Sequence, residues 1–118
     1  MRADVRVHRD FSHRNLLWDG PAVTGVVDWV ETSTGPRWLD AAHAATNLAV
    51  AFAPEPARAF LAAYAGHTDA PPDRHWLVMD AVGFLPPPGK PAMFGDPDQL
   101  RRLDDWLHEV AQPQFRAD

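Results

Sequence analysis

A change from β-prone to helix-prone sequence near residue 38 most constrains how this chain can fold. Two runs rich in Val, Leu and Trp, Leu16–Trp18 and Val23–Trp29, flank the turn signal D-G-P at residues 19–21. Two β-prone runs around such a turn predict a β-hairpin. Val5–Val7 predicts a further short strand, and the β character ends at Trp38.

The rest of the chain is predicted to be helical, because apolar residues recur at helical spacing between prolines and glycines. Trp38, Trp76 and Trp106 stand among these apolar residues and are expected in the core. The fold class is therefore α+β, mainly α, with an N-terminal β-hairpin followed by about four helices. The helices are expected at residues 37–52, 56–66, 73–85 and 97–110.

Length and composition exclude several classes of protein. A chain of 118 residues suffices for one core and is too short for two, so a single domain over residues 1–118 is expected. The net charge of −5 argues against nucleic-acid binding. No apolar run is as long as a membrane span and no signal peptide is evident, so we expect a cytoplasmic protein without a membrane partner. Because cysteine is absent, any metal must be held by oxygen or imidazole.

Four polar residues carry the chemistry that the sequence suggests. They are His8, Asp10 and Asn15, on the stretch between the first two β-prone segments, and Asp28, at the end of the hairpin. An aspartate on a loop can accept a proton from a hydroxyl group, while an amide oxygen and a second carboxylate can hold Mg²⁺ from two sides. Phosphoryl transfer needs this combination of positioning and charge neutralisation.

At this point the sequence resembles the aminoglycoside phosphotransferase family, which is related to choline kinases and, more distantly, to protein kinases. Members carry a catalytic loop H-G-D-x-x-x-x-N, then a hairpin, then I-D-W, and D-x-A at the start of a helix. The corresponding segments are HRDFSHRN at residues 8–15, VVDW at 26–29 and LDAA at 39–42. The later helices are also similar to the C-terminal lobe of this family, so the resemblance covers nearly the whole chain.

The resemblance implies a fold, a reaction and a set of roles. The fold would be a protein-kinase-like C-terminal lobe, and the reaction would be transfer of the γ-phosphoryl group of ATP to a hydroxyl of a small molecule. Asp10 would be the catalytic base, and Asn15 and Asp28 would bind Mg²⁺. Asp40 would brace the catalytic loop, with His8 as a scaffold residue. The resemblance identifies no residue that binds ATP itself.

The chain departs from the family in two ways. Arg9 stands where the family usually has glycine. No G-x-G-x-x-G occurs, and the only lysine, Lys90, lies in a proline-rich stretch, so the N-terminal nucleotide lobe is expected to be missing. Met1 then resembles an internal start, and the isolated chain is expected to have little kinase activity. Its partner would be an N-lobe polypeptide, or a second copy bound through the exposed lobe face near Trp18 and Trp29.

Two other functions stay open. The first is a non-catalytic binding or assembly module that retains the substrate pocket and awaits an N-lobe partner. The second is a metal-dependent hydrolase in which His8, Asp10 and His13 would hold zinc.

The polar residues also have purely structural interpretations. Asp10 and Asn15 could cap a turn, and Asp40 could be a carboxylate favoured by a helix dipole. The four remaining histidines are expected at the surface or in helix packing: His43, His67, His75 and His108.

Overall fold

The computed structural model describes residues 4–29, 31–69, 71–86, 88–91 and 95–115. Met1, interpreted above as an internal start, and Pro87, in the proline-rich stretch that contains Lys90, lie outside these ranges. The helices and short strands confirm the predicted α+β, mainly α class. The strands are β1 (Asp4–Val7), β2 (Leu16–Asp19), β3 (Ala22–Val26) and β4 (Ser33–Pro36); a 3₁₀ helix η1 (His13–Asn15) precedes β2, and the helices are α1 (Arg37–Ala51), α2 (Pro54–Thr68), α3 (Arg74–Gly83) and α4 (Pro97–Val110).

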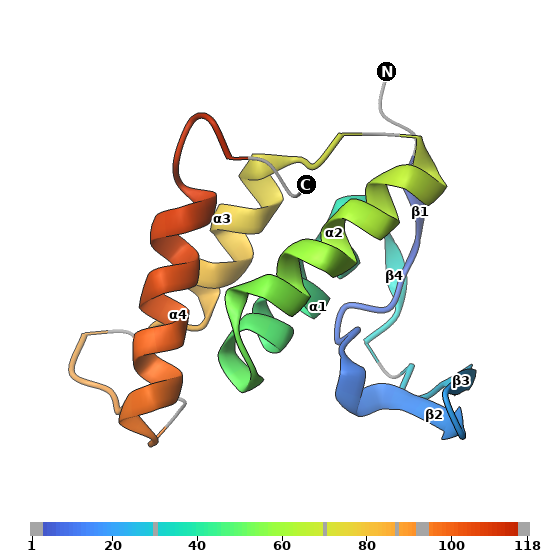
Figure 1. Ribbon diagram of the computed structural model, residues 1–118, viewed down its shortest axis with the longest axis horizontal. Coiled ribbons are helices and arrows are strands. Elements are labelled where there is room, and N and C mark those ends of the chain that lie inside the picture. The colour runs from blue at the N-terminus through green and yellow to red at the C-terminus, as the bar shows by residue number, and fades with distance from the viewer. Residues whose placement is uncertain (1–3, 30, 70, 87, 92–94, 116–118) are drawn as a thin grey trace.

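The strands form two separate antiparallel pairs at one end of the helical bundle (Figure 1). The predicted hairpin is β2–β3, which turns at Gly20 with a left-handed φ of 58° and ends at Val26, three residues earlier than expected. The partner of β1 is β4, whose sequence STGP has no β-prone pattern. Gly35 of β4 faces Val7 so closely that an added Cβ would lie 3.4 Å from the valine side chain.

The helix boundaries follow local capping chemistry. Asp73 accepts a hydrogen bond from the His75 N–H (3.1 Å) at the start of α3, and Asp96 accepts one from the Asp98 N–H (2.9 Å) at the start of α4. The helix α2 extends beyond its predicted limits at both ends and stops at Asp69, whose φ is 52°. A left-handed residue of this kind is a common helix stop.

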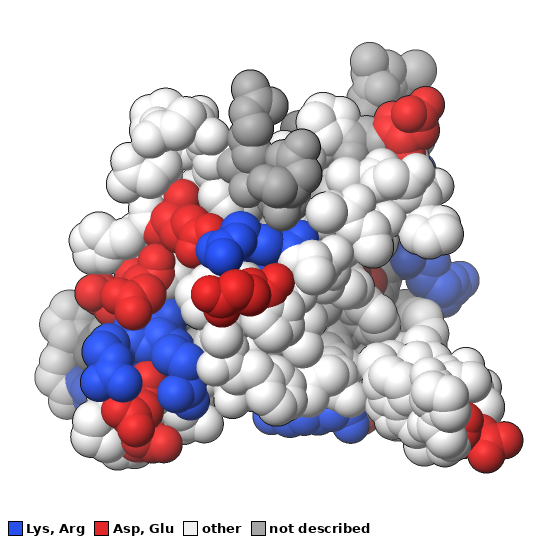
Figure 2. Space-filling model, viewed as in Figure 1, with Lys and Arg blue, Asp and Glu red and all other residues white. Residues whose placement is uncertain are grey.

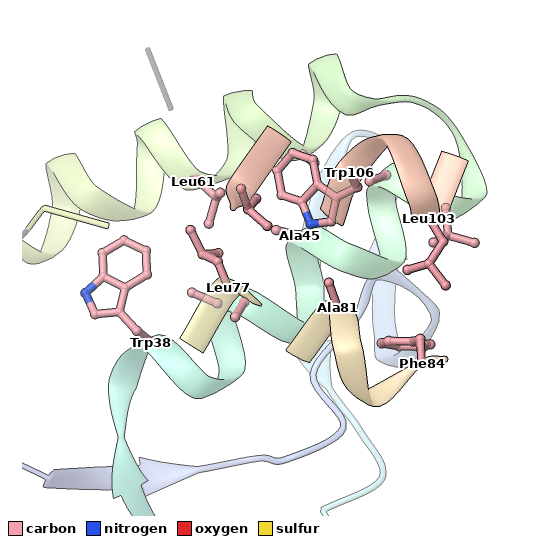
Figure 3. Packing of buried hydrophobic residues seen from close by; sticks show 14 residues of the cluster. Trp38, Ala45, Leu61, Leu77, Ala81, Phe84, Leu103 and Trp106 are labelled. Carbon is pink, nitrogen blue, oxygen red and sulfur yellow. The ribbon is translucent and has the colours of Figure 1, made fainter. Parts of the chain in front are cut away.

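The core forms where α1 packs against the other three helices (Figure 3). Four alanines of α1 are fully buried, and their small side chains let neighbouring helices approach closely: Ala41, Ala42, Ala45 and Ala49. Larger side chains from the other helices fill the space around them, chiefly Leu61, Leu77, Leu103 and Trp106. As predicted, Trp38 and Trp106 are buried, while Trp76 packs at the edge of the core.

The surface is uneven in charge. Figure 2 shows charged side chains gathered over α4, whereas the β2–β3 hairpin at the lower right is mostly uncharged on this face. The large apolar side chains of the hairpin and its following turn are exposed, including Trp18 (55%) and Trp29 (46%), as expected. Among the helices of the described residues, none is long and apolar enough to cross a membrane.

Replacing Trp106 by alanine should lower the free energy of unfolding by about 3–5 kcal/mol, because a fully buried indole leaves a cavity among four helices. The matched control is Trp18→Ala, which removes the same side chain from an exposed position and should cost less than about 0.5 kcal/mol. Urea denaturation of both variants measures the difference. Equal losses would contradict the assignment of the core.

Candidate functional site

The loop after β1 is held in place by the imidazole of His8. This side chain is only 1% exposed. Its Nε2 donates to the carbonyl oxygen of Val27 (2.7 Å), and its Nδ1 accepts from the backbone N–H of Asp10 (3.1 Å). Both contacts are satisfied together only by the tautomer that carries its proton on Nε2. His8 thus links the start of the loop to the end of the hairpin.

Asp40, in the first turn of α1, binds the same loop from the other side. Its Oδ2 accepts from the backbone N–H of His8 (2.5 Å), and its Oδ1 accepts from the backbone N–H of Arg9 (2.8 Å). Hydrogen bonds to an ionised carboxylate are stronger than neutral ones. Both oxygens of Asp40 therefore fix the backbone just before Asp10, in addition to any favourable effect on the helix dipole.

Asn15 closes the loop around Asp10. Its Nδ2 donates to the backbone oxygen of Asp10 (2.8 Å) and lies 3.4 Å from Asp10 Oδ2. The turn between them is stabilised by Ser12, which is buried and whose hydroxyl accepts from the N–H of Arg14 (3.3 Å). Because the amide nitrogen of Asn15 is committed to the loop, the group that Asn15 can offer to a ligand is its amide oxygen.

Hydrogen bonds of the neighbouring residue Val27 hold the backbone at Asp28 beside the loop. The N–H of Val27 donates to the backbone oxygen of Asn15 (2.9 Å), and its carbonyl accepts from His8. Asp28 itself is exposed and has a left-handed φ of 65°, which aspartate tolerates better than most residues. The structure thus joins His8, Asp10, Asn15 and Asp40 by direct contacts and places Asp28 one residue beyond this network.

A pocket of about 330 Å³ opens beside the carboxylate of Asp10. The side chain of Asp10 is 43% exposed, so its carboxylate is accessible to a molecule in the pocket. The other walls come from η1, α1 and the α3 region: Arg14, His43, Met79, Asp80, Gly83 and Phe84. The pocket therefore combines a carboxylate-rich wall with an arginine and an aromatic ring.

His43 and Asp80 belong to this site, although the sequence indicated neither. His43 Nε2 lies 3.2 Å from Asp10 Oδ1, and its Nδ1 lies 2.9 Å from Asp80 Oδ1. Burial by itself lowers the pKa of His43, but the hydrogen bonds and charges of Asp80 and Asp10 outweigh it and raise that pKa above the ordinary value of 6.5. The spacing of three residues from Asp40 could have placed His43 on the loop-facing side of α1. No sequence signal links Asp80, on a distant helix, to the loop.

The structure contradicts the zinc hydrolase interpretation. Both ring nitrogens of His8 are already used within the loop, and His13 turns toward Phe52, with ring centroids 5.2 Å apart. Burial, together with the charge of Arg14, lowers the pKa of His13. Within the described ranges, no three His, Cys, Asp or Glu side chains are grouped so that they could hold a metal ion.

Magnesium requires other ligands than zinc does. It is usually bound by one or two protein carboxylates together with oxygens of phosphate and water. The amide oxygen of Asn15 and the exposed carboxylate of Asp28 are hard oxygen donors of the required kind. The contact of the Asn15 nitrogen with Asp10 leaves this oxygen available. This donor set fits magnesium better than zinc.

Comparison with known families finds a match over most of the chain. The family model described as APH, phosphotransferase enzyme family, matches residues 1–80. This range spans the loop, the hairpin, α1 and α2, and ends at Asp80 within α3. No curated protein and no solved structure matches the chain at a significant level.

Replacing Asp40 by asparagine should lower the free energy of unfolding by about 1–3 kcal/mol, because an amide offers only one acceptor to the two backbone N–H groups of His8 and Arg9. Amide hydrogen exchange at these two residues should also accelerate. Asp96→Asn is the control, since asparagine caps a helix as well as aspartate does. Similar effects of the two changes would contradict a bracing role for Asp40.

Arg9→Gly should keep the free energy of unfolding unchanged or raise it by up to about 1 kcal/mol, because Arg9 has a left-handed φ of 75° that glycine adopts without strain. The gain is partly offset by loss of the hydrogen bond from Arg9 Nε to Ser33 Oγ. Arg6→Gly, in strand β1, is the control and should lower the value by about 0.5–1 kcal/mol. Thermal and urea denaturation rank the two variants, and a larger loss at position 9 would contradict the expectation.

Proposed function

The chain belongs to the phosphotransferase enzyme family, and on this premise we propose that its site serves transfer of the γ-phosphoryl group of ATP to a hydroxyl of a small molecule. A phosphotransferase function in general follows from the family. The donor, the metal and the kind of acceptor are our proposal. The observation that carries it is the position of Asp10, whose carboxylate contacts Asn15 Nδ2 (3.4 Å) and His43 Nε2 (3.2 Å) and is also accessible from the 330 Å³ pocket.

Asp10 acts on the acceptor hydroxyl in this proposal. A hydroxyl group bound in the pocket would donate its hydrogen bond to the Asp10 carboxylate, which would orient the oxygen and take up its proton. The new O–P bond would form as the bond from the γ-phosphorus to the β,γ-bridging oxygen of ATP breaks and ADP leaves. Because the transition state of phosphoryl transfer is loose, accurate orientation contributes more than strong basicity. The contacts from His8, Asp40 and Asn15 that hold the loop support this role.

Asn15 and Asp28 are the proposed magnesium ligands. The amide oxygen and the exposed carboxylate would bind the ion, and the ion would neutralise charge on the phosphates of ATP. The link through Val27 keeps the two residues in register, since this residue is hydrogen-bonded to both the Asn15 backbone and His8. His8 and Asp40 position this arrangement without touching the substrate.

We further propose that residues 1–118 form a single domain, a catalytic lobe that works with a nucleotide-binding β-lobe polypeptide. The support is the apolar surface that lies beside the proposed magnesium ligands. Leu17, Trp18, Val23 and Trp29 are each 46–55% exposed there. Such a cluster is typical of an interaction site. A second copy of the chain could cover this apolar surface instead. Measuring the oligomeric state in solution distinguishes a homodimer from a chain that awaits a β-lobe partner.

A binding module without catalysis is the second candidate, because the pocket beside Asp10 is formed by this chain alone. Calorimetry distinguishes the two functions. Binding of a small hydroxyl compound without binding of Mg-ATP favours the module, and binding of both favours the phosphotransferase.

The metal site can be tested directly with Mn²⁺, a paramagnetic substitute for Mg²⁺, in NMR spectra of the full chain. We expect line broadening concentrated at Asn15, Val27 and Asp28, and its loss in Asp28→Asn. Asp98→Asn, an exposed change at the start of α4, is the control and should retain the broadening. Broadening that persists unchanged in Asp28→Asn would overturn the assignment of Asp28 as a metal ligand.

Turnover of ATP by the isolated chain, measured with Mg²⁺ over a panel of hydroxyl compounds, is expected to be low. Any transfer that occurs should fall by about 100-fold or more in Asp10→Asn, since loss of a positioned acid or base typically costs this much. Transfer that survives this substitution would contradict the role of Asp10. Robust Asp10-dependent transfer would instead contradict the need for a β-lobe partner.

A further inference from the structure

One imidazole stands between two carboxylates at the wall of the pocket. His43 of α1 has its Nε2 3.2 Å from Asp10 Oδ1, on the loop, and its Nδ1 2.9 Å from Asp80 Oδ1, on α3. The side chains of His43 and Asp80 are only 18% and 17% exposed. This chain of three groups connects the proposed catalytic carboxylate to a helix that is distant in sequence.

The ring of His43 is held in this orientation by its surroundings. It stacks on Phe84, with centroids 5.4 Å apart and planes inclined by 20°. Its backbone belongs to α1, the helix that also presents Asp40 to the loop. The ring therefore has little freedom to turn away from Asp10. A shift of α1, or of the end of α3 where Phe84 lies, would disturb the contact between His43 and Asp10.

The protonation state of His43 decides how many of these hydrogen bonds form. A neutral imidazole carries a single N–H, whereas the imidazolium ion donates from both nitrogens. Two ionised carboxylates facing both nitrogens thus favour the imidazolium form, in agreement with the raised pKa of His43. Arg14 also lines the pocket and its positive charge acts in the opposite direction. The second oxygen of Asp80 is buried without a partner among the described residues, so His43 is the main compensation for its charge.

We propose that His43 is a positioning residue for Asp10: as an imidazolium anchored by Asp80, it holds Asp10 Oδ1. The acceptor hydroxyl would then bind Asp10 Oδ2, an oxygen that also lies 3.4 Å from Asn15 Nδ2. This inference rests on the proposed function for the identity of the acceptor group. Its structural part, the coupling of Asp80 through His43 to Asp10, stands on the contacts alone. A misplacement of the order of 1 Å in a reacting group reduces rates by about 100-fold, so such an anchor has a measurable effect.

Two substitutions separate positioning from simple packing. Glutamine places its amide nitrogen near the position of the imidazole Nε2, whereas asparagine places its amide nitrogen near Nδ1. His43→Gln therefore retains a donor toward Asp10 and His43→Asn retains one toward Asp80. His108→Gln, at an exposed histidine that contacts Asp104, is the matched control.

The primary readout is NMR of the full-length chain without substrate. We expect His108→Gln to leave the chemical shift of the Asp10 carboxyl carbon unchanged. His43→Gln keeps the donor toward Asp10 but removes the positive charge, so it should move this shift less than His43→Asn does, which removes both. Equal shifts in both His43 variants, or in neither, would overturn the proposal. Because this readout needs no turnover, it tests the coupling even if no acceptor is found.

A pH titration of the imidazole gives the second readout. The pKa of His43 should lie above 6.5 in the wild type and fall in both Asp80→Asn and Asp10→Asn. When folding raises the pKa of a group, the group stabilises the folded state. This stabilisation is complete at a pH below the pKa of the unfolded protein, and it is lost as the pH rises through the pKa of the folded protein. The wild type should therefore lose stability relative to His43→Gln as the pH rises from 6.5 through the raised pKa of His43. A pKa at or below 6.5 would overturn the proposal.

The outcomes also distinguish this inference from the proposed function. Transfer that depends on Asp10 but is equal in the two His43 variants would refute the positioning role and retain the phosphotransferase. Low transfer by the isolated chain is expected and refutes neither. Absence of Mn²⁺ broadening at Asn15 and Asp28 and of binding by any hydroxyl compound, together with the expected NMR differences at Asp10, would retain the coupling and refute the proposed function. Where transfer is measured, His43→Asn should lower kcat by about 10- to 100-fold with a smaller change in KM.

Discussion

The rest of the site depends on the hydrogen bonds that the carboxylate of Asp40 accepts from the loop. This carboxylate accepts hydrogen bonds from two consecutive backbone amides, those of His8 and Arg9, and so joins the start of α1 to the loop that carries Asp10. This junction lets Arg9 adopt its left-handed backbone, because two charge-assisted hydrogen bonds compensate for a conformation that costs a non-glycine residue about 1–2 kcal/mol. Glycine would adopt this conformation without that cost.

The helix α1 serves as both core and scaffold. One part of its surface carries the fully buried alanines that let the other helices approach, and another part carries Asp40 and His43 toward the loop. Because α1 packs on three other helices, the core holds its position, and α1 in turn holds the loop through Asp40 and His43. Asp10 is thereby held through three separate elements: by His8 and Asn15 within the loop, by His43 on α1, and through His43 by Asp80 on α3.

The surface distribution separates two regions with different roles. Figure 2 shows charged side chains gathered over α4. In contrast, Leu17 and Trp18 of the hairpin are exposed, as is Trp29, which follows the proposed magnesium ligand Asp28. Apolar groups of this size are costly to leave in water unless another surface covers them. Among the described residues, none of the exposed apolar side chains of the hairpin lines the pocket beside Asp10, so the proposed partner lobe and the proposed acceptor would bind through different residues.

The sequence by itself determined the elements that depend on local signals: the β2–β3 hairpin through its D-G-P turn, the helices through periodicity and capping, and the candidate residues on the H-R-D loop through spacing along the chain. It missed β4, whose Gly35 and Pro36 have little strand preference and pair in the structure with Val5 and Asp4 of β1. It missed His43 and Asp80 as well, since neither has a motif around it. Only the tertiary structure brought these two side chains to Asp10, because their contacts join three elements separated by more than thirty residues each, and the packing of α3 on α1 sets them.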